Sequence, residues 1–171
     1  FQDVDSSFET DLFTPILAKI EEMSGILYNG QTAFKVIADH IKAITFALSD
    51  GASFGNTGRD YVLRRLLRRS SRFGKQLGFN EPFLYKLVGT VCETMGDFYK
   101  ELYEKRAEVE ALILEEEKLF LKTLEQGIRK LDDILATVTD GVVSGYDAFK
   151  LYDTFGFPLE LTEEIAIEKG Y

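Results

Sequence analysis

The sequence has few of the residues from which metal sites and disulfide frameworks are built. It contains one cysteine and one histidine. A single cysteine excludes a disulfide framework and a multi-cysteine zinc site, and a single histidine excludes a histidine-rich metal cluster. No apolar run approaches the roughly 20 residues that a transmembrane helix needs, and no signal peptide is recognisable. We therefore expect a soluble protein in a reducing, cytoplasmic compartment, with no membrane partner.

Motifs for an independent active site are also absent. There is no GxGxxG fingerprint, no P-loop and no GxSxG nucleophile elbow. Cys92 lies among apolar residues, as a buried and inert thiol would. His40 lies inside an amphipathic helical pattern and is expected at the surface or at the edge of the core. The sequence therefore predicts no catalytic residue and no metal ligand, and it offers no residues for a self-contained hydrolase.

The composition is that of an ordinary globular protein, with 45% hydrophobic and 29% charged residues. A chain of this length buries about two-thirds of its unfolded surface, which is enough for a core without cross-links. The sequence starts at Phe1 and stops just after a helical pattern. We therefore expect it to be a piece of a longer protein.

Apolar residues recur at spacings of three and four along most of the chain, which predicts an all-α helical bundle. One long helix is expected, and a break in it near Gly127 stays open, as does a short β pair in the loop at 137–145. The whole chain, residues 1–171, is expected to form one domain, with a possible subdivision into 1–97 and 98–171. The expected helices start or run at Thr10–Gly25, Thr32–Leu48, Arg59–Leu77, Asn80–Gly96, Phe98–Ala136, Tyr146–Thr154 and from about Thr162.

Charge is distributed unevenly. The net charge of −9 argues against a protein that coats nucleic acid non-specifically. One helical segment is nevertheless strongly basic and contains a single acid, Asp60. Arginine is preferred where a planar fork meets phosphate oxygens, so an exposed arginine face predicts contacts to an RNA backbone. The basic residues are Arg59, Arg64, Arg65, Arg68, Arg69, Arg72 and Lys75.

This arginine face has a plainer interpretation, in which it pairs with the many acidic residues of neighbouring helices. The acidic run Glu115–Glu117 is expected to be a solvated face. Asn56 precedes the basic helix and is typical of a turn or a helix cap. Asp153 lies in the last turn of its helix, where the macrodipole disfavours a carboxylate. With Tyr152, Phe155 and Phe157 nearby, Asp153 is a candidate reader of a hydrogen-bond donor.

Three long stretches are similar to the alanyl-tRNA synthetase family of class II enzymes. They are VIADHIKAITFALSDG (Val36–Gly51), NTGRDYVLRRLLRRSSRFG (Asn56–Gly74) and LYDTFGFPLELT (Leu151–Thr162), and ETDLF (Glu9–Phe13) fits the start of the same region. The resemblance implies the helical tRNA-recognition domain between the aminoacylation and editing domains, which are the flanking partners. ATP and Mg²⁺ would then belong to the aminoacylation domain and zinc to the editing domain, with no cofactor in this chain.

In that family the domain reads a G·U wobble pair in the acceptor stem of alanine tRNA. A-form RNA exposes its minor groove, where the wobble leaves the guanine 2-amino group unpaired. The resemblance implies that Asn56 and Asp153 are the base readers and that the helix from Arg64 to Arg72 grips the backbone. The parent would be an ATP-dependent alanine–tRNA ligase whose aminoacylation site lies outside this chain. The alternative is a helical protein–protein interaction module with an arginine-rich docking face.

The chain departs from the family pattern at two places. Phe54-Gly55 stands where the family usually has Pro-Ser before the asparagine, and Asp60 stands where it usually has glycine. We expect the first departure to make the loop around Asn56 more flexible. The second adds a negative charge close to the expected RNA surface and is expected to weaken phosphate contact.

Overall fold

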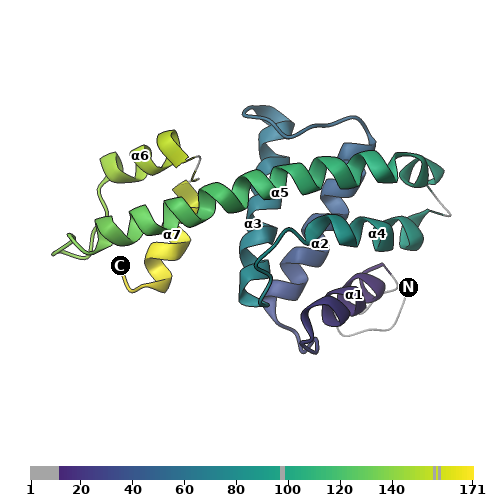
Figure 1. Cartoon of the computed structure of the whole chain (residues 1–171), viewed down its shortest axis with the longest axis horizontal. Coiled ribbons are helices and arrows are strands. Elements are labelled where there is room, and N and C mark those ends of the chain that lie inside the picture. Colours follow the sequence, from purple (N-terminus) through teal and green to yellow (C-terminus); the bar gives the residue numbers. More distant parts are fainter. Residues whose placement is uncertain (1–11, 97–98, 156, 158) are drawn as a thin grey trace. The chain divides into compact units, whose positions relative to one another are not determined.

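The computed structural model describes residues 12–96, 99–155, 157 and 159–171, and every regular element in this part of the chain is helical. The all-α prediction is thereby confirmed, including the single long helix α5 (Figure 1). The expected helix starts at Thr10 and Phe98 lie outside the described residues, as do Gly156 and Pro158, which follow the expected helix Tyr146–Thr154. The elements are α1 (Thr14–Ser24), α2 (Thr32–Ser49), α3 (Gly58–Gln76), the 3₁₀ helix η2 (Leu84–Leu87), α4 (Val88–Met95), α5 (Lys100–Leu135), α6 (Gly145–Phe155) and α7 (Leu159–Glu168).

The chain divides into two compact units, residues 1–118 and 119–171. The division falls inside α5 and not at the 97/98 subdivision considered from the sequence. Each unit has its own cluster of buried apolar side chains, to which α5 contributes. No helix of the described residues combines the length and the apolar character that crossing a bilayer requires.

In the first unit, α2 is the element on which α1, α3 and α4 pack. The apolar residues on its packed face follow the 3.6-residue period, and Phe34, Ile37 and Ile41 are fully buried in the core. Two chain reversals of this unit use glycine. Gly25 ends α1 and Gly78 follows α3, both with positive φ, which glycine adopts without a Cβ penalty.

The predicted start of the fourth helix at Asn80 is wrong. Residues 80–83 are not helical, and the turn η2 precedes α4. The reason is a distant partner, because the Phe83 and Leu84 amides donate to the Glu117 carboxylate of α5, at 2.9 and 3.0 Å. The helical turn therefore begins where a side chain from another helix accepts its first N–H groups.

In the second unit, the C-terminal part of α5 packs with α6 and α7. Its core contains Phe120, Leu124 and Leu131 of α5 together with Leu151 and Phe157. Helix α5 continues through Gly127 without the break that the sequence left open. A Cβ at Gly127 would lie 2.6 Å from the Phe157 ring, so glycine is needed there for close packing.

Two further expectations for this unit need correction. The loop at 137–145 forms turns and no β pair. Its amides are used locally, as when Val142 N donates to Asp140 Oδ1, and Gly141 turns the chain at a φ of 75°. The last helix starts at Leu159, earlier than Thr162, and carries Glu160 in its first turn, where the helix dipole favours an acid. Ser144 caps the start of α6, since Asp147 N donates to Ser144 Oγ.

Candidate nucleic-acid interface

The basic residues of α3 do not all share one exposed face. Arg59, Arg65, Arg69 and Lys75 are exposed, Arg64 and Arg68 are half-buried, and Arg72 is only 8% exposed. Helix α3 buries Leu63, Leu67 and Ser71 in the interior of the first unit. Arg64, Arg68 and Arg72 each follow one of these buried positions and therefore lie at the edge of the packed side. The exposed set is therefore smaller than the seven basic residues that the sequence places on this segment.

Two of the exposed arginines lie over aromatic rings of their own helix. The Arg65 guanidinium is 5.8 Å from the centre of the Tyr61 ring, and that of Arg69 is 5.6 Å from the centre of the Phe73 ring. Cation–π contacts of this kind contribute about 0.5–1 kcal/mol at exposed sites. They restrict where the two cations lie without removing them from the surface, which suits a surface that meets a polyanion.

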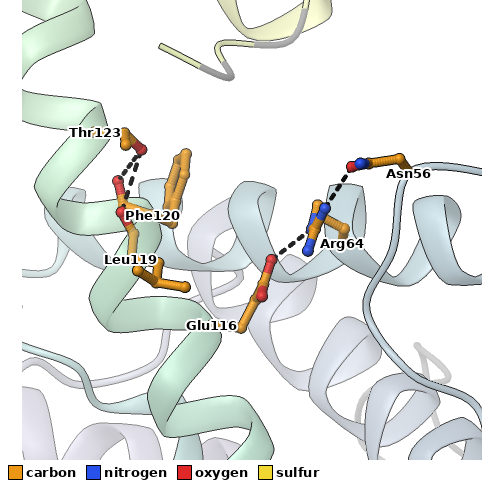
Figure 2. A network of polar contacts seen from close by, with 6 residues as sticks. All are labelled: Asn56, Arg64, Glu116, Leu119, Phe120 and Thr123. Atoms are coloured by element: carbon orange, nitrogen blue, oxygen red, sulfur yellow. Dashed lines mark hydrogen bonds and ion pairs between the residues drawn. The ribbon is translucent and has the colours of Figure 1, made fainter.

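Arg64 makes two directed hydrogen bonds, one to each side (Figure 2). Its Nε donates to Glu116 Oε1 at 2.6 Å, and its Nη1 donates to Asn56 Oδ1 at 2.6 Å. The three side chains come from α5, α3 and the loop before α3. The plainer interpretation of the arginine face is thus correct for Arg64, which pairs with an acid of a neighbouring helix.

The loop that carries Asn56 is fastened to the start of α3. Ser53 donates to the Asp60 carboxylate from its amide, at 3.3 Å, and from its hydroxyl, at 3.0 Å. Gly55 N donates to Asp60 O at 3.2 Å. A Cβ at Gly55 would lie 3.0 Å from Asp60 Cβ. The two departures from the family pattern therefore fit each other, and the Asp60 charge is used to hold the loop.

Glu117 is a residue whose role the sequence prediction missed. It was expected on a solvated face with Glu115 and Glu116, and Glu115 is indeed exposed, but Glu117 is fully buried. Ser71 Oγ donates to its Oε2 at 2.8 Å, besides the two amides of η2. Burial raises the pKa of Glu117, and the three hydrogen bonds oppose that rise. Glu117 joins α3, η2 and α5 and thereby holds the helix that carries the exposed arginines.

Asp153 lies in the last turn of α6 and is exposed. The three aromatic residues expected around it differ in position. Tyr152 is exposed, Phe155 is half-buried and Phe157 is 1% exposed, packed in the core against Gly127. Asp153 belongs to the second unit and Asn56 to the first. The structure describes each candidate reader within its own unit, and both are accessible to a ligand.

Cys92 and His40, the two residues considered for reactive or metal chemistry, are both buried in the first unit. Cys92 is fully buried, its Sγ donates to Leu102 O at 3.4 Å, and burial raises the pKa of its thiol. His40 is 8% exposed, and burial lowers the pKa of its imidazole against the opposing effect of Asp39. Among the described residues, no three His, Cys, Asp or Glu side chains gather where they could hold a metal ion.

Comparison with known proteins now decides the family. The family model described as "tRNA synthetases class II (A)" matches residues 1–171. The chain belongs to this family. It is 52% identical over 169 residues to an alanine–tRNA ligase of Acholeplasma laidlawii, and the match covers 99% of this chain and 20% of that protein. Alanine–tRNA ligases of Thermus thermophilus and Streptococcus sanguinis are 52% and 53% identical over 173 residues, covering 99% and 98% of this chain. The chain spans about a fifth of the length of these relatives.

The three stretches that are similar to the alanyl-tRNA synthetase family lie on helices of the structure and on the loops beside them. Val36–Gly51 forms most of α2 and the turn after it, and Asn56–Gly74 forms the loop end and α3. Leu151–Thr162 runs from α6 into α7. The exposed residues in those stretches include Asn56, the exposed cations of α3 and Asp153. Asn56 and the exposed cations of α3 are the candidate interface of the first unit, and Asp153 is a candidate reader in the second unit.

Proposed function

We propose that this chain is the tRNA-recognition part of an alanine–tRNA ligase, which docks the acceptor stem of alanine tRNA and reads its G·U wobble pair. The parent enzyme would attach alanine to tRNA in an ATP-dependent reaction in the cytoplasm. ATP and Mg²⁺ would act in a flanking aminoacylation domain, and zinc would be held in a flanking editing domain. The observation that carries the proposal is the match to alanine–tRNA ligases over 99% of the chain.

The exposed cations of α3 are the proposed backbone contacts. Arg59, Arg65, Arg69 and Lys75 are accessible, and long basic side chains at successive turns reach several phosphates of one strand. Phosphate contacts position the RNA and do not read its sequence. The burial of Arg72 and the pairing of Arg64 favour internal roles for these two residues, so the proposal depends on the exposed four.

Asn56 and Asp153 are the proposed readers of the wobble pair. The guanine 2-amino group is a donor in the minor groove, and a carboxylate such as that of Asp153 accepts from it. An amide such as that of Asn56 meets a neighbouring base edge. Because the two residues belong to different units, the proposal requires the RNA to contact both units. A charge-assisted contact contributes about 1.5–3 kcal/mol, which corresponds to roughly a tenfold to hundredfold preference.

The test compares charging of alanine tRNA that carries either G·U or a Watson–Crick G·C pair. The ligase with this chain is used as wild type and with Asn56→Ala or Asp153→Ala. We expect wild type to prefer G·U by about tenfold to hundredfold and each variant to lose much of this preference. Glu115→Ala, an exposed change on α5, serves as the control and keeps it. Unchanged discrimination in both Asn56→Ala and Asp153→Ala would overturn the assigned roles.

A salt titration of RNA binding separates this proposal from a protein-docking role. Several phosphate contacts predict a steep linear fall of the logarithm of affinity with the logarithm of salt concentration. A docking module that ignores RNA gives no binding to titrate, and that result would favour the arginine face as a site for an acidic protein.

A further inference from the structure

The bonds of Arg64 fix the orientation of the Asn56 amide. A guanidinium carries donors only, so the Asn56 atom that faces Arg64 Nη1 must be the carbonyl oxygen. The Nδ2 amine is then on the other branch of an exposed side chain (Figure 2). Asn56 therefore presents its donor to a ligand, while its carbonyl oxygen already accepts from Arg64.

Arg64 is itself held from the other side by Glu116. The side chains of Arg64 and Glu116 are 20% and 12% exposed, so solvent screens this ion pair less than it screens a surface pair. Arg65, the next residue, has an exposed side chain that lies over the Tyr61 ring. Two neighbouring arginines of one helix are thus used differently, one turned toward the protein and one toward solvent.

We infer that Arg64, anchored by Glu116, is a positioning residue that holds Asn56 as a hydrogen-bond donor toward the acceptor stem. The acceptors of the minor groove are purine N3 and pyrimidine O2, so these are the atoms that Asn56 would meet. Accepting from the guanine 2-amino group is then left to a carboxylate. The inference rests on the proposed function, and it changes the role of Arg64 from gripping the RNA backbone to setting the specificity of another residue.

The RNA-binding arm of the test uses acceptor-stem hairpins with G·U or G·C. Arg64→Met removes the donors, and Arg64→Lys keeps the charge but not the planar fork. Both are expected to reduce the preference for G·U from about tenfold or more to less than about threefold, with the salt dependence unchanged. The matched control Arg65→Met is expected to weaken binding to both hairpins equally and to lower the salt slope by about one.

The opposite pattern would overturn the inference. If Arg64→Met keeps the G·U preference and lowers the salt slope, Arg64 contacts phosphate. If Arg64→Lys keeps the wild-type preference for G·U, a positive charge alone is enough for that preference, and the planar guanidinium is not needed to orient Asn56. Glu116→Gln is expected to lower the preference partly, whereas Glu115→Gln on the exposed side leaves it unchanged, and equal effects of the two would contradict the anchoring role.

A second arm needs no RNA and separates this inference from the proposed function. The NMR order parameter of the Asn56 side-chain amide is measured in wild type and variants, all checked for folding by circular dichroism. We expect a rigid amide in wild type and in Arg65→Met, and a value below about 0.6 in Arg64→Met. No change in Arg64→Met overturns the inference. Suppose that Asn56→Ala leaves RNA discrimination intact, while the order parameter of the Asn56 amide falls in Arg64→Met as expected. The proposed reading role of Asn56 then fails, but the positioning of its amide by Arg64 stands.

Discussion

Two consecutive carboxylates of α5 have separate tasks at the residue scale. Glu116 accepts from Arg64 and thereby acts on the loop that carries Asn56. Glu117 accepts from Ser71 and from the amides of Phe83 and Leu84, and so joins α3 to η2. Removing an acceptor from buried donors costs about 1–3 kcal/mol for each group left unsatisfied. The first carboxylate therefore serves the candidate site, and the second serves the fold that supports it.

The raised pKa of Glu117 predicts a pH-dependent difference between wild type and Glu117→Gln. An acid whose folded pKa lies above its unfolded value contributes stability below the unfolded value and loses it as the pH rises through the folded value. The unfolding free energy of wild type should therefore fall relative to that of Glu117→Gln as the pH rises above about 4.3. Each pKa unit between the two states corresponds to about 1.4 kcal/mol.

Urea denaturation of both proteins between about pH 4 and pH 8 measures this difference, because that range includes the ordinary glutamate pKa. Glu115→Gln is the matched control, since Glu115 is exposed on the same helix, and its difference from wild type should stay nearly constant. A Glu117→Gln difference that is independent of pH, or that favours wild type more at high pH, contradicts the account.

The burial of Glu117 has a signal in the sequence that charge obscured. Position 117 lies four residues after Ile113 and three before Phe120, both buried, so it belongs to the apolar stripe of α5. Three consecutive glutamates suggest a solvent-exposed segment. A helix, however, turns by about 100° per residue, so only some of the three side chains point outward. The partners of Glu117 in α3 and η2 lie 33–46 residues away in sequence, and periodicity alone does not name them.

At the element scale, α5 depends on a glycine in the middle of a long helix. Gly127→Ala would gain about 0.5–1 kcal/mol in helix propensity. Its Cβ would however lie 2.6 Å from the buried Phe157 ring, and overpacking of a core costs about 1–3 kcal/mol. We expect net destabilisation, measured as faster hydrogen exchange at the amides of α6 and α7.

Gly145→Ala is the control for this prediction. Gly145 starts α6, and a Cβ there meets no atom within 4 Å. That variant should leave exchange unchanged or slow it slightly. Equal protection in Gly127→Ala and wild type would show that the ring moves aside at little cost, against the packing described for the second unit.

The helices that local signals delimit were predicted well, and those that depend on distant partners were not. The expected bounds of α2 and α3 agree with the structure to within a residue or so, because an apolar period and a following glycine or Asp50-Gly51 mark them. The start of α4 was wrong because Glu117 orders η2 from another helix. The β pair at 137–145, which the sequence left open, does not form because the turns there satisfy their own amides locally. The charge of α3 was predictable, but which arginines are buried depends on α2 and α5.

At the scale of the whole molecule, a net charge of −9 coexists with a local basic surface on α3. Such a distribution disfavours general attraction to nucleic acid and favours contact at one place. The exposed cations belong to the first unit and Asp153 to the second. In the proposed function, phosphate contacts from the first unit orient the acceptor stem, and base contacts from both units select it.

The most direct test of the central claim removes a single group from the RNA. Replacing guanine by inosine in the wobble pair deletes the 2-amino group and leaves the rest of the base edge in place. We predict that this chain binds the G·U hairpin about tenfold more tightly than the inosine·U hairpin, and that Asp153→Ala binds both equally. Equal binding of the two hairpins by wild type would contradict the claim that the chain reads the wobble guanine.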